Sequence, residues 1–472
     1  MSVIVASCSV AELFKGEVIV ASNGSEITGS LHLPEYQRPY RWKEEQLKRL
    51  LKDLKSHFEP PKDVPPANHD FYIGSIILHQ QTTVEGEQLL NIIDGQQRLT
   101  TLALVAYLQR AGSEPTLTYD SPISQNQIRK NLKWLKDQDL SRLDLANVNI
   151  TLVVTHSEDD AYRFFETQNT GGVRLGGVDI IKAHHLRATP QNQQNDYAKQ
   201  WESLKHLDLL IDSILKGRYW RVLNFRYLPS YKDSIEIKRK PIVKELGDDT
   251  GLSPDDRAYQ AISIVKQNGQ SQIYLAQTNG YAMCQPINAG INTIHYFQYF
   301  YNLRQQLLIE KNDSHLKEFY EFYHSVIFDL KGCDFLKDLF ESAILLYVSQ
   351  FGTANLYEAS LWLFRVTYSP RVIHKRSVYE MSIPKLIEDR KGPVFDWILM
   401  SYNHEQCIER LKSYTYEIST ENIESKKGTY KSLFVDATIK KLNMQLLDSN
   451  RADFDKALVE AIELKIKGLR HE

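Results

Sequence analysis

The spacing of apolar residues changes along this 472-residue chain, and the change limits the folds that the chain can adopt. Residues 1–227 combine short strand-like runs with helix-like stripes, whereas residues 257–472 carry almost only helical patterns. The stretch 228–256 between them is rich in charges, prolines and glycines. The sequence therefore predicts an α+β protein with a mixed N-terminal domain (1–227), a linker (228–256) and a mainly α-helical C-terminal domain (257–472).

Several segments of the N-terminal region predict particular elements. Leucines and a phenylalanine recur at helical spacing over residues 43–58, which predicts an amphipathic helix. Residues 71–80 and 88–93 are apolar runs separated by a polar, glycine-containing turn, which predicts a β-hairpin. Residues 150–155 predict another strand, and a helical stripe begins at Gln97.

The overall charge and the cysteines exclude some classes of protein. The chain has 57 Lys plus Arg against 59 Asp plus Glu, so any site for a polyanion must be local. The four cysteines form no C-x-x-C pair, which argues against a disulfide framework and favours a reducing cytoplasm. We expect no export signal and no membrane span, because no apolar run approaches the roughly 18 residues that a span needs.

The stretch "LNIIDGQQRLTTLALV" places five polar or small residues, 94–98, where a predicted strand turns into a predicted helix. The start of a helix offers unpaired N–H groups to an anion, and Gly95 allows a ligand to approach the backbone. Arg98 suits phosphate oxygens, and Gln96 and Gln97 suit a base, a ribose or a metal-bound water. Asp94 suits a cation or can orient Arg98. The alternative is local: Asp94 caps the helix, Gly95 makes the turn and Arg98 pairs nearby.

Two further junctions carry similar residues. In "EYQRPYRW", Gln37 and Arg38 offer a charged contact to phosphate, and Tyr40 and Trp42 offer flat faces to a base. The alternative is a surface turn in which Trp42 packs on the helix that follows.

The third junction runs from Asn169 to Gly172, and Asp179 and Lys182 follow it in another predicted helix. Its alternative reading is a helix that simply ends at glycines.

Taken together, these patterns resemble a known family. Q-R-x-Y-x-W, then I-D-G-Q-Q-R-L-T-T-L, then F-x-x-x-N-x-x-G-x-x-L followed by D-x-I-K is similar to the N-terminal domain of GmrSD-type modification-dependent restriction proteins. The resemblance covers about residues 10–225. It implies a domain with a ParB/sulfiredoxin-like fold. Such a domain would hydrolyse a nucleoside triphosphate, with Mg²⁺ expected, and would couple hydrolysis to the sensing of modified or foreign DNA.

The resemblance also implies roles for individual residues and gathers the three junctions in one nucleotide site. Asp94, Gln96, Gln97 and Arg98 would form the phosphate and hydrolysis loop. The nucleotide would be held by Gln37, Arg38, Tyr40, Trp42, Gly95, Asn169, Gly172, Asp179 and Lys182. The ligands of a metal are not identified by the sequence.

The C-terminal region departs from the family, in which a His-Me finger nuclease usually follows. His374 and His404 do not stand in the sequence context of such a nuclease, and the D-x-K-like triplet at Asp389 has no convincing acidic partner upstream. We therefore expect the nuclease, or another effector, to be a partner protein from a neighbouring gene.

One basic segment lies outside these patterns. Residues 129–136 hold Arg129, Lys130, Lys133 and Lys136 with Trp134 among them. A solvated helix face is the default interpretation, and a contact with a nucleic-acid backbone is the alternative.

Three functional hypotheses therefore remain. The first is an NTP-hydrolysing sensor of a restriction or anti-phage system, with DNA as a partner. The second is a nucleotide- or DNA-binding module that docks a partner without turnover. The third is a self-contained nuclease with an unrecognised site in residues 257–472. The sequence leaves self-association open.

Overall fold

The computed structural model divides into two compact units. One consists of Met1–Leu175 with Pro190–Glu202, and the other of Gly176–Thr189 with Ser203–Glu472. Each unit is described separately below. The structure describes residues 3–59, 70–83, 85–109, 117–158, 160–161, 176–222, 233–258, 262–267, 270–275, 280–328, 330–375, 378–380, 382–383, 386, 393–424 and 428–469.

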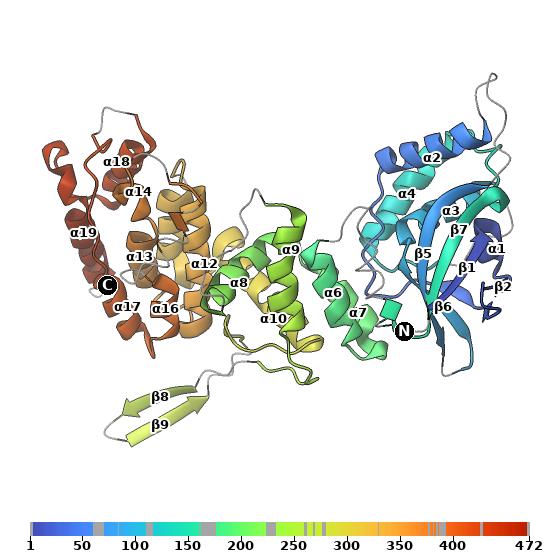
Figure 1. Ribbon diagram of the computed structural model, residues 1–472. Helices are drawn as coiled ribbons and strands as arrows, with labels where there is room; N and C mark the ends of the chain where they lie inside the picture. Colours follow the sequence, from blue (N-terminus) through green and yellow to red (C-terminus); the bar gives the residue numbers. More distant parts are fainter. Residues whose placement is uncertain are drawn as a thin grey trace. The chain divides into compact units, whose positions relative to one another are not determined.

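The first unit contains a five-stranded mixed sheet with the order β1-β7-β5-β6-β4 (Figure 1). The β1/β7 and β5/β6 pairs are antiparallel, whereas the β5/β7 and β4/β6 pairs are parallel. Two short strands, β2 and β3, pair separately. The bounds are β1 (Val3–Ser9), β2 (Ile19–Val20), β3 (Glu26–Ile27), β4 (Ser30–His32), β5 (Phe71–Thr82), β6 (Gln88–Asp94) and β7 (Val148–Thr155).

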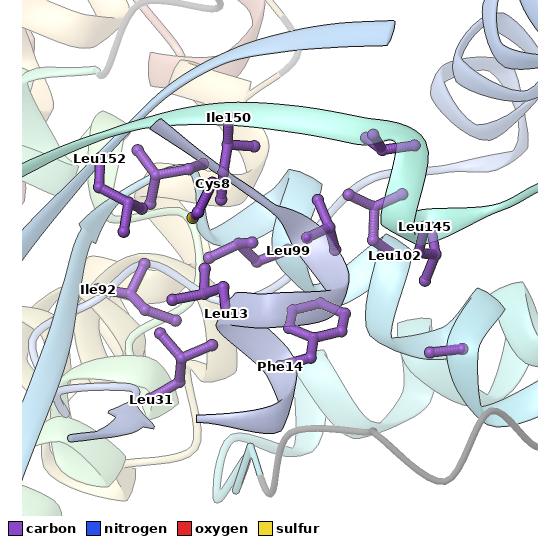
Figure 2. Close-up of a cluster of buried hydrophobic side chains, with 14 of the residues drawn as sticks. Cys8, Leu13, Phe14, Leu31, Ile92, Leu99, Leu102, Leu145, Ile150 and Leu152 are labelled. Atoms are coloured by element: carbon purple, nitrogen blue, oxygen red, sulfur yellow. The ribbon is translucent and has the colours of Figure 1, made fainter. Parts of the chain in front are cut away.

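The helices of this unit pack on the sheet around one apolar core. Figure 2 shows side chains of α1, α3 and the strands meeting there, among them Leu13 of α1, Leu99 and Leu102 of α3 and Ile150 of β7. Leu99, Leu102 and Ile150 are fully buried, so α3 is anchored along its apolar side. The helical segments are α1 (Val10–Lys15), α2 (Glu44–Phe58), α3 (Gln96–Gln109), α4 (Pro122–Lys136), η1 (Leu145–Asn147), η2 (Gln191–Gln193) and α7 (Gln194–Ser203).

The second unit is mainly helical, and its described residues also include one β-hairpin, β8–β9. Long buried runs in α12 and α13 form the centre of its core. Three segments, η3, η4 and η6, are π-helical and continue a preceding α-helix.

The elements of the second unit have the following bounds: α6 (Gly177–Arg187), α8 (Leu207–Val222), α9 (Ile235–Val243), η3 (Lys244–Asp248), β8 (Ile262–Gln267), β9 (Gln270–Leu275), α10 (Ile291–Arg304), η4 (Gln305–Glu310), η5 (Ser314–Leu316), α11 (Lys317–Phe322), η6 (Tyr323–Phe328), α12 (Asp334–Phe351), α13 (Leu356–Thr367), α14 (Pro370–Ile373), α16 (Val394–Leu399), α17 (His404–Lys412), α18 (Tyr430–Leu442), η8 (Asp448–Asp453) and α19 (Phe454–Leu469).

The predicted α+β class is confirmed, as are the hairpin of β5 and β6, strand β7 and helices α2 and α3. The structure differs within the expected linker 228–256, where residues 235–248 form α9 and η3. A charged residue in this stretch is not necessarily exposed. Glu245 is buried and accepts a hydrogen bond from Arg218 Nε at 2.8 Å.

Two further observations concern the chain as a whole. All four cysteines are free thiols. Among the described residues, no helix combines the length and apolar character that a membrane crossing requires.

Candidate functional site

The turn from β6 into α3 depends on Gly95. Its φ is +93°, a conformation that side chains disfavour, and a Cβ there would lie 2.1 Å from Ile76 Cδ1 of β5. Gly95 therefore lets the turn pack closely against the neighbouring strand β5, whereas the sequence suggested that it lets a ligand approach the backbone. This packing holds the start of α3 against the sheet.

Arg98, in the first turn of α3, fills an irregularity in β5. The β5/β7 register shifts between Tyr72 and Ser75. The Arg98 guanidinium donates to Ile73 O at 3.0 Å, to Ser75 O at 2.8 Å and to Asp94 Oδ2 at 3.2 Å. The sequence predicts that Arg98 binds phosphate, but in this structure its guanidinium donates to protein acceptors. Asp94 is its ion-pair partner.

Gln97 is buried and joins the start of α3 to the "EYQRPYRW" segment, residues 35–42, which we call the elbow. Its Oε1 accepts from the N–H groups of Arg41 at 2.8 Å and Trp42 at 3.1 Å. Its Nε2 donates to Pro39 O at 3.2 Å and to Gln96 Oε1 at 3.3 Å. An amide has two acceptor positions and two donors, so Gln97 has no capacity left for a ligand.

Gln96 differs from its neighbour. Its side chain is only 4% exposed, and its Nε2 has no hydrogen-bond partner in the described part of the chain. An unpaired buried amide N–H costs free energy unless a ligand or a water satisfies it. Of the two predicted glutamines, Gln96 is therefore the one with a free donor.

The aromatic residues of the elbow serve its packing. Tyr40 is fully buried, and its hydroxyl bonds with Thr101 Oγ1 at 2.7 Å and Asn131 Nδ2 at 2.9 Å. Burial raises the pKa of Tyr40, so the phenol stays neutral. Trp42 packs partly buried against the core. In this conformation the Tyr40 ring is packed inside the protein, and its contact with a base stays a prediction.

Gln37 and Arg38 line a small pocket, which we call the elbow pocket. Gln37 Nε2 donates to Ile93 O at 3.0 Å, next to the Asp94 junction. The guanidinium of Arg38 makes no hydrogen bond or ion pair with any residue that the structure describes, although the side chain is half-buried. The pocket encloses about 30 Å³, close to the volume of one water molecule.

The other walls of the elbow pocket were not predicted. One wall is the approach to α4, where Ser121 is the N-cap residue and its buried Oγ has no partner in the described structure. Another wall is α7, which contributes Lys199 and Glu202. Asp120 joins these walls, because it accepts from Asn195 Nδ2 at 2.8 Å and lies 3.8 Å from Lys199 Nζ.

A sequence signal existed for only one of these walls. Ser121 followed by Pro122 is typical of a helix start and could have marked the N-terminus of α4. Tyr119, also in the pocket lining, hydrogen-bonds Thr100 Oγ1 of α3, and burial raises its pKa. Nothing in the sequence indicated that α7, about 160 residues after the elbow, would complete the pocket.

The remaining predicted residues lie elsewhere. Asp179 and Lys182 are on α6 of the second unit, Asp179 in the first turn and Lys182 buried. Asn169, Gly172 and Asp389 lie outside the described residues. The shared nucleotide site that would gather all three junctions stays a prediction.

The two late histidines do not form a metal site in the described structure. His404 Nδ1 hydrogen-bonds Tyr347 OH at 2.7 Å, and its Nε2 lies 3.4 Å from Glu358 Oε2. His374 follows the short helix α14. Among the described residues, no group of three or more His, Cys, Asp or Glu side chains is arranged to hold a metal ion.

Two regions of the chain match known families. Residues 19–186 match the model described as "GmrSD restriction endonuclease, N-terminal domain". Residues 193–427 match a family of unknown function, DUF7834. No curated protein gives a significant match to the chain. The first match covers the elbow and the start of α3, and the second covers most of the helical region.

Proposed function

Because the chain carries a GmrSD-type N-terminal domain, we propose that it is the sensor of a restriction or anti-phage defence system. The sensor binds and hydrolyses a nucleoside triphosphate and couples this reaction to DNA recognition. A nuclease or another effector is supplied by a partner protein. The family match supports the restriction-related role, and the residues of the elbow pocket support the nucleotide-binding part.

Arg38 is the observation that carries nucleotide binding. A half-buried guanidinium without a protein partner is costly unless a ligand completes its hydrogen bonds. Arg38 lines the elbow pocket beside the N-terminus of α4, where backbone N–H groups and the helix dipole also favour an anion. Two independent features thus suit phosphate, and Ser121 Oγ adds a buried hydroxyl that has no partner among the described residues.

The other polar residues fit supporting roles in this proposal. Asp120 is a pocket carboxylate that would help to hold Mg²⁺, which would offset the negative charge of the phosphates. Gln96 does not line the pocket in this structure, but its Nε2 has no partner among the described residues and would orient the attacking water once the pocket widens. Gln97 and Arg98 position the elbow and the start of α3 through their contacts with the protein.

The pocket must widen before a nucleotide can enter. Ligand sites for molecules of this size enclose several hundred Å³, against about 30 Å³ for the elbow pocket. Asp120 contacts the α7 wall in two ways, through a charge-assisted hydrogen bond from Asn195 and a long ion pair with Lys199. A hydrogen bond to a charged group contributes about 1.5–3 kcal/mol and an exposed ion pair about 1 kcal/mol or less, so the free energy of binding a triphosphate can offset their loss.

The test compares Arg38→Gln with Arg41→Gln, which removes the same charge from an exposed side chain of the elbow that does not line the pocket. Binding of each of the four NTPs with Mg²⁺ is measured by calorimetry, and hydrolysis by phosphate release. We expect Arg38→Gln to weaken binding by about 10-fold or more, since a charge-assisted hydrogen bond contributes roughly 1.5–3 kcal/mol. Arg41→Gln should bind as the wild type does.

Three results would contradict the proposal. No binding of any NTP would remove the nucleotide function altogether. Equal losses in both variants would mean non-specific attraction, and no loss in Arg38→Gln would place the site elsewhere.

A binding module without turnover is the second candidate. Three of the predicted catalytic residues have protein partners: Gln97 binds the elbow, Arg98 binds β5, and Asp94 pairs with Arg98. Tight NTP binding without phosphate release, in the presence and absence of DNA, would favour this candidate over the hydrolysing sensor.

A further inference from the structure

A second concave surface of the first unit lies between α2 and α4, which contact each other (Figure 1). This α2–α4 groove has a volume of about 540 Å³. Lys48, Lys52 and Lys55 line its α2 side together with Glu59, and Trp134 and Gln138 line its α4 side. None of these residues lines the elbow pocket, so the two surfaces are distinct.

The charge of the groove is positive, although the whole chain has a net charge of −2. Lys52 and Lys55 make no ion pair in the described structure, and Lys48 pairs only with the exposed Glu44 one turn away. The one carboxylate in the groove lining, Glu59, lies 4.0 Å from Arg142 Nε. The groove therefore presents cations that the protein does not neutralise.

Helix α4 extends this positive surface. It has four basic residues, Arg129, Lys130, Lys133 and Lys136, and no acidic residue. Lys130 stands four positions before Trp134, so the two side chains share one row of the helix. The alternative interpretation of this segment, a contact with a nucleic-acid backbone, thus gains a second row of lysines on α2.

The geometry suits a flexible polyanion with planar groups. Lys48, Lys52 and Lys55 succeed one another along α2 at rises of about 6 Å and 4.5 Å, which lets each ammonium reach a different phosphate. Trp134 packs against the apolar core and also lines the groove. An anchored tryptophan beside a row of lysines combines the stacking platform and the backbone contacts that bind single-stranded nucleic acid.

We propose that the α2–α4 groove binds a single DNA strand, with phosphates on Lys48, Lys52 and Lys55 and a base stacked on Trp134. This inference rests on the proposed function for DNA as the partner and adds the surface that the DNA contacts. An acidic peptide would satisfy the lysines but would leave Trp134 without a stacking partner.

The test measures binding of a labelled 12-nucleotide single strand to the full chain by fluorescence anisotropy at 50–200 mM salt. The triple variant Lys48→Gln, Lys52→Gln, Lys55→Gln should bind at least 10-fold more weakly at the lowest salt. Its salt dependence should be shallower by about 2 in log–log slope, since each phosphate contact to a single strand contributes roughly 0.7. The matched control, Lys440→Gln, Lys456→Gln, Lys467→Gln, removes three exposed lysines from α18 and α19.

Tryptophan fluorescence tests the stacking part. Binding of unlabelled strand should quench the emission of the wild type, and the quenching should be lost in Trp134→Phe, which keeps an aromatic ring packed on the core. Quenching that persists in Trp134→Phe would overturn the role of Trp134. Equal DNA affinity of the groove variant and the control variant would overturn the groove itself, as would tighter binding of polyglutamate than of DNA.

The two proposals can fail separately. The groove variant should still bind NTP, and Arg38→Gln should still bind DNA. Loss of DNA binding in Arg38→Gln but not in the groove variant would move the DNA site to the elbow pocket and overturn this inference.

Discussion

The guanidinium of Arg98 occupies the space that a side chain at Gly74 would need. A Cβ at Gly74 would lie 2.6 Å from Arg98 Nη1, and the φ of Gly74 is +109°. The carbonyls on either side of this glycine, those of Ile73 and Ser75, accept from the same guanidinium. Arg98 and Gly74 therefore form one structural unit that sets the shape of β5.

This relationship predicts that Arg98→Ala lowers stability, whatever its effect on activity. The variant leaves the carbonyls of Ile73 and Ser75 without their donor, and we expect a loss of about 2 kcal/mol in the free energy of unfolding. Gly74→Ala should cost a similar amount, because the new methyl group meets Arg98 in a strained backbone. Urea unfolding measures both. A stable Arg98→Ala that loses only NTP hydrolysis would instead assign Arg98 to catalysis.

The two adjacent glutamines predict opposite outcomes. Gln97→Leu removes three hydrogen bonds between α3 and the elbow and one to Gln96, and should destabilise the protein by about 2–3 kcal/mol. Gln96→Leu removes a buried donor that has no partner and one long bond to Gln97, so it should cost about 1 kcal/mol or less.

If Gln96 orients the attacking water, NTP hydrolysis should be lost more in Gln96→Leu than in Gln97→Leu, the reverse of the order expected for stability. Gln96→Leu should then lose most phosphate release while it still binds NTP, as measured on folded protein at low temperature. Unchanged hydrolysis in Gln96→Leu would remove Gln96 from the reaction. Equal stability losses in the two variants would contradict the hydrogen-bond assignment.

The sequence predicted the positions of most first-unit elements because their apolar spacing is regular. It also marked both the elbow and the start of α3, and Gln97 does connect them. It could not tell that Arg98 would be used by β5, because a glycine within a strand pattern does not reveal which side chain fills the space beside it. The sequence pattern of a polar residue at a helix start is the same whether that residue binds a ligand or a neighbouring strand.

The pocket walls were unpredictable for another reason. Asp120 and Asn195 are 75 residues apart, and neither belongs to a recognisable pattern. Their contact depends on how α7 packs in the first unit, which one sequence does not encode in any local spacing. The same limit explains the expected linker, where the partner of Glu245 is the distant Arg218.

The contact between Asp120 and Asn195 predicts how the elbow pocket opens. Asn195→Ala removes the hydrogen bond that holds α7 to the approach of α4. If nucleotide binding needs α7 to move, the variant should bind NTP several-fold more tightly, since less free energy is spent on opening. Asn192→Ala, in the exposed η2 segment, is the control. Calorimetry with a non-hydrolysable analogue gives the affinities, and a weaker Asn195→Ala would mean that Asn195 contacts the bound nucleotide.

The buried His185 of α6 predicts an acid-dependent loss of stability in the second unit. Burial lowers its pKa to about 3, and the neighbouring His184 adds to the shift. Gly290 N–H donates to its Nδ1 at 3.3 Å, and its Nε2 lies 2.7 Å from Leu246 O, an arrangement that requires the neutral ring with a proton on Nε2.

The sign of the pH effect follows from which state binds more protons. Between pH 6.5 and about 3 the unfolded histidine is protonated and the folded one is not, so stability is complete above pH 6.5 and falls as the pH is lowered. The slope is at most about 1.4 kcal/mol per pH unit. In urea unfolding from pH 7 to 4.5, His185→Gln should therefore lose less stability than the wild type. The exposed His315→Gln serves as the control, and parallel curves for wild type and His185→Gln would show that His185 does not carry the acid sensitivity.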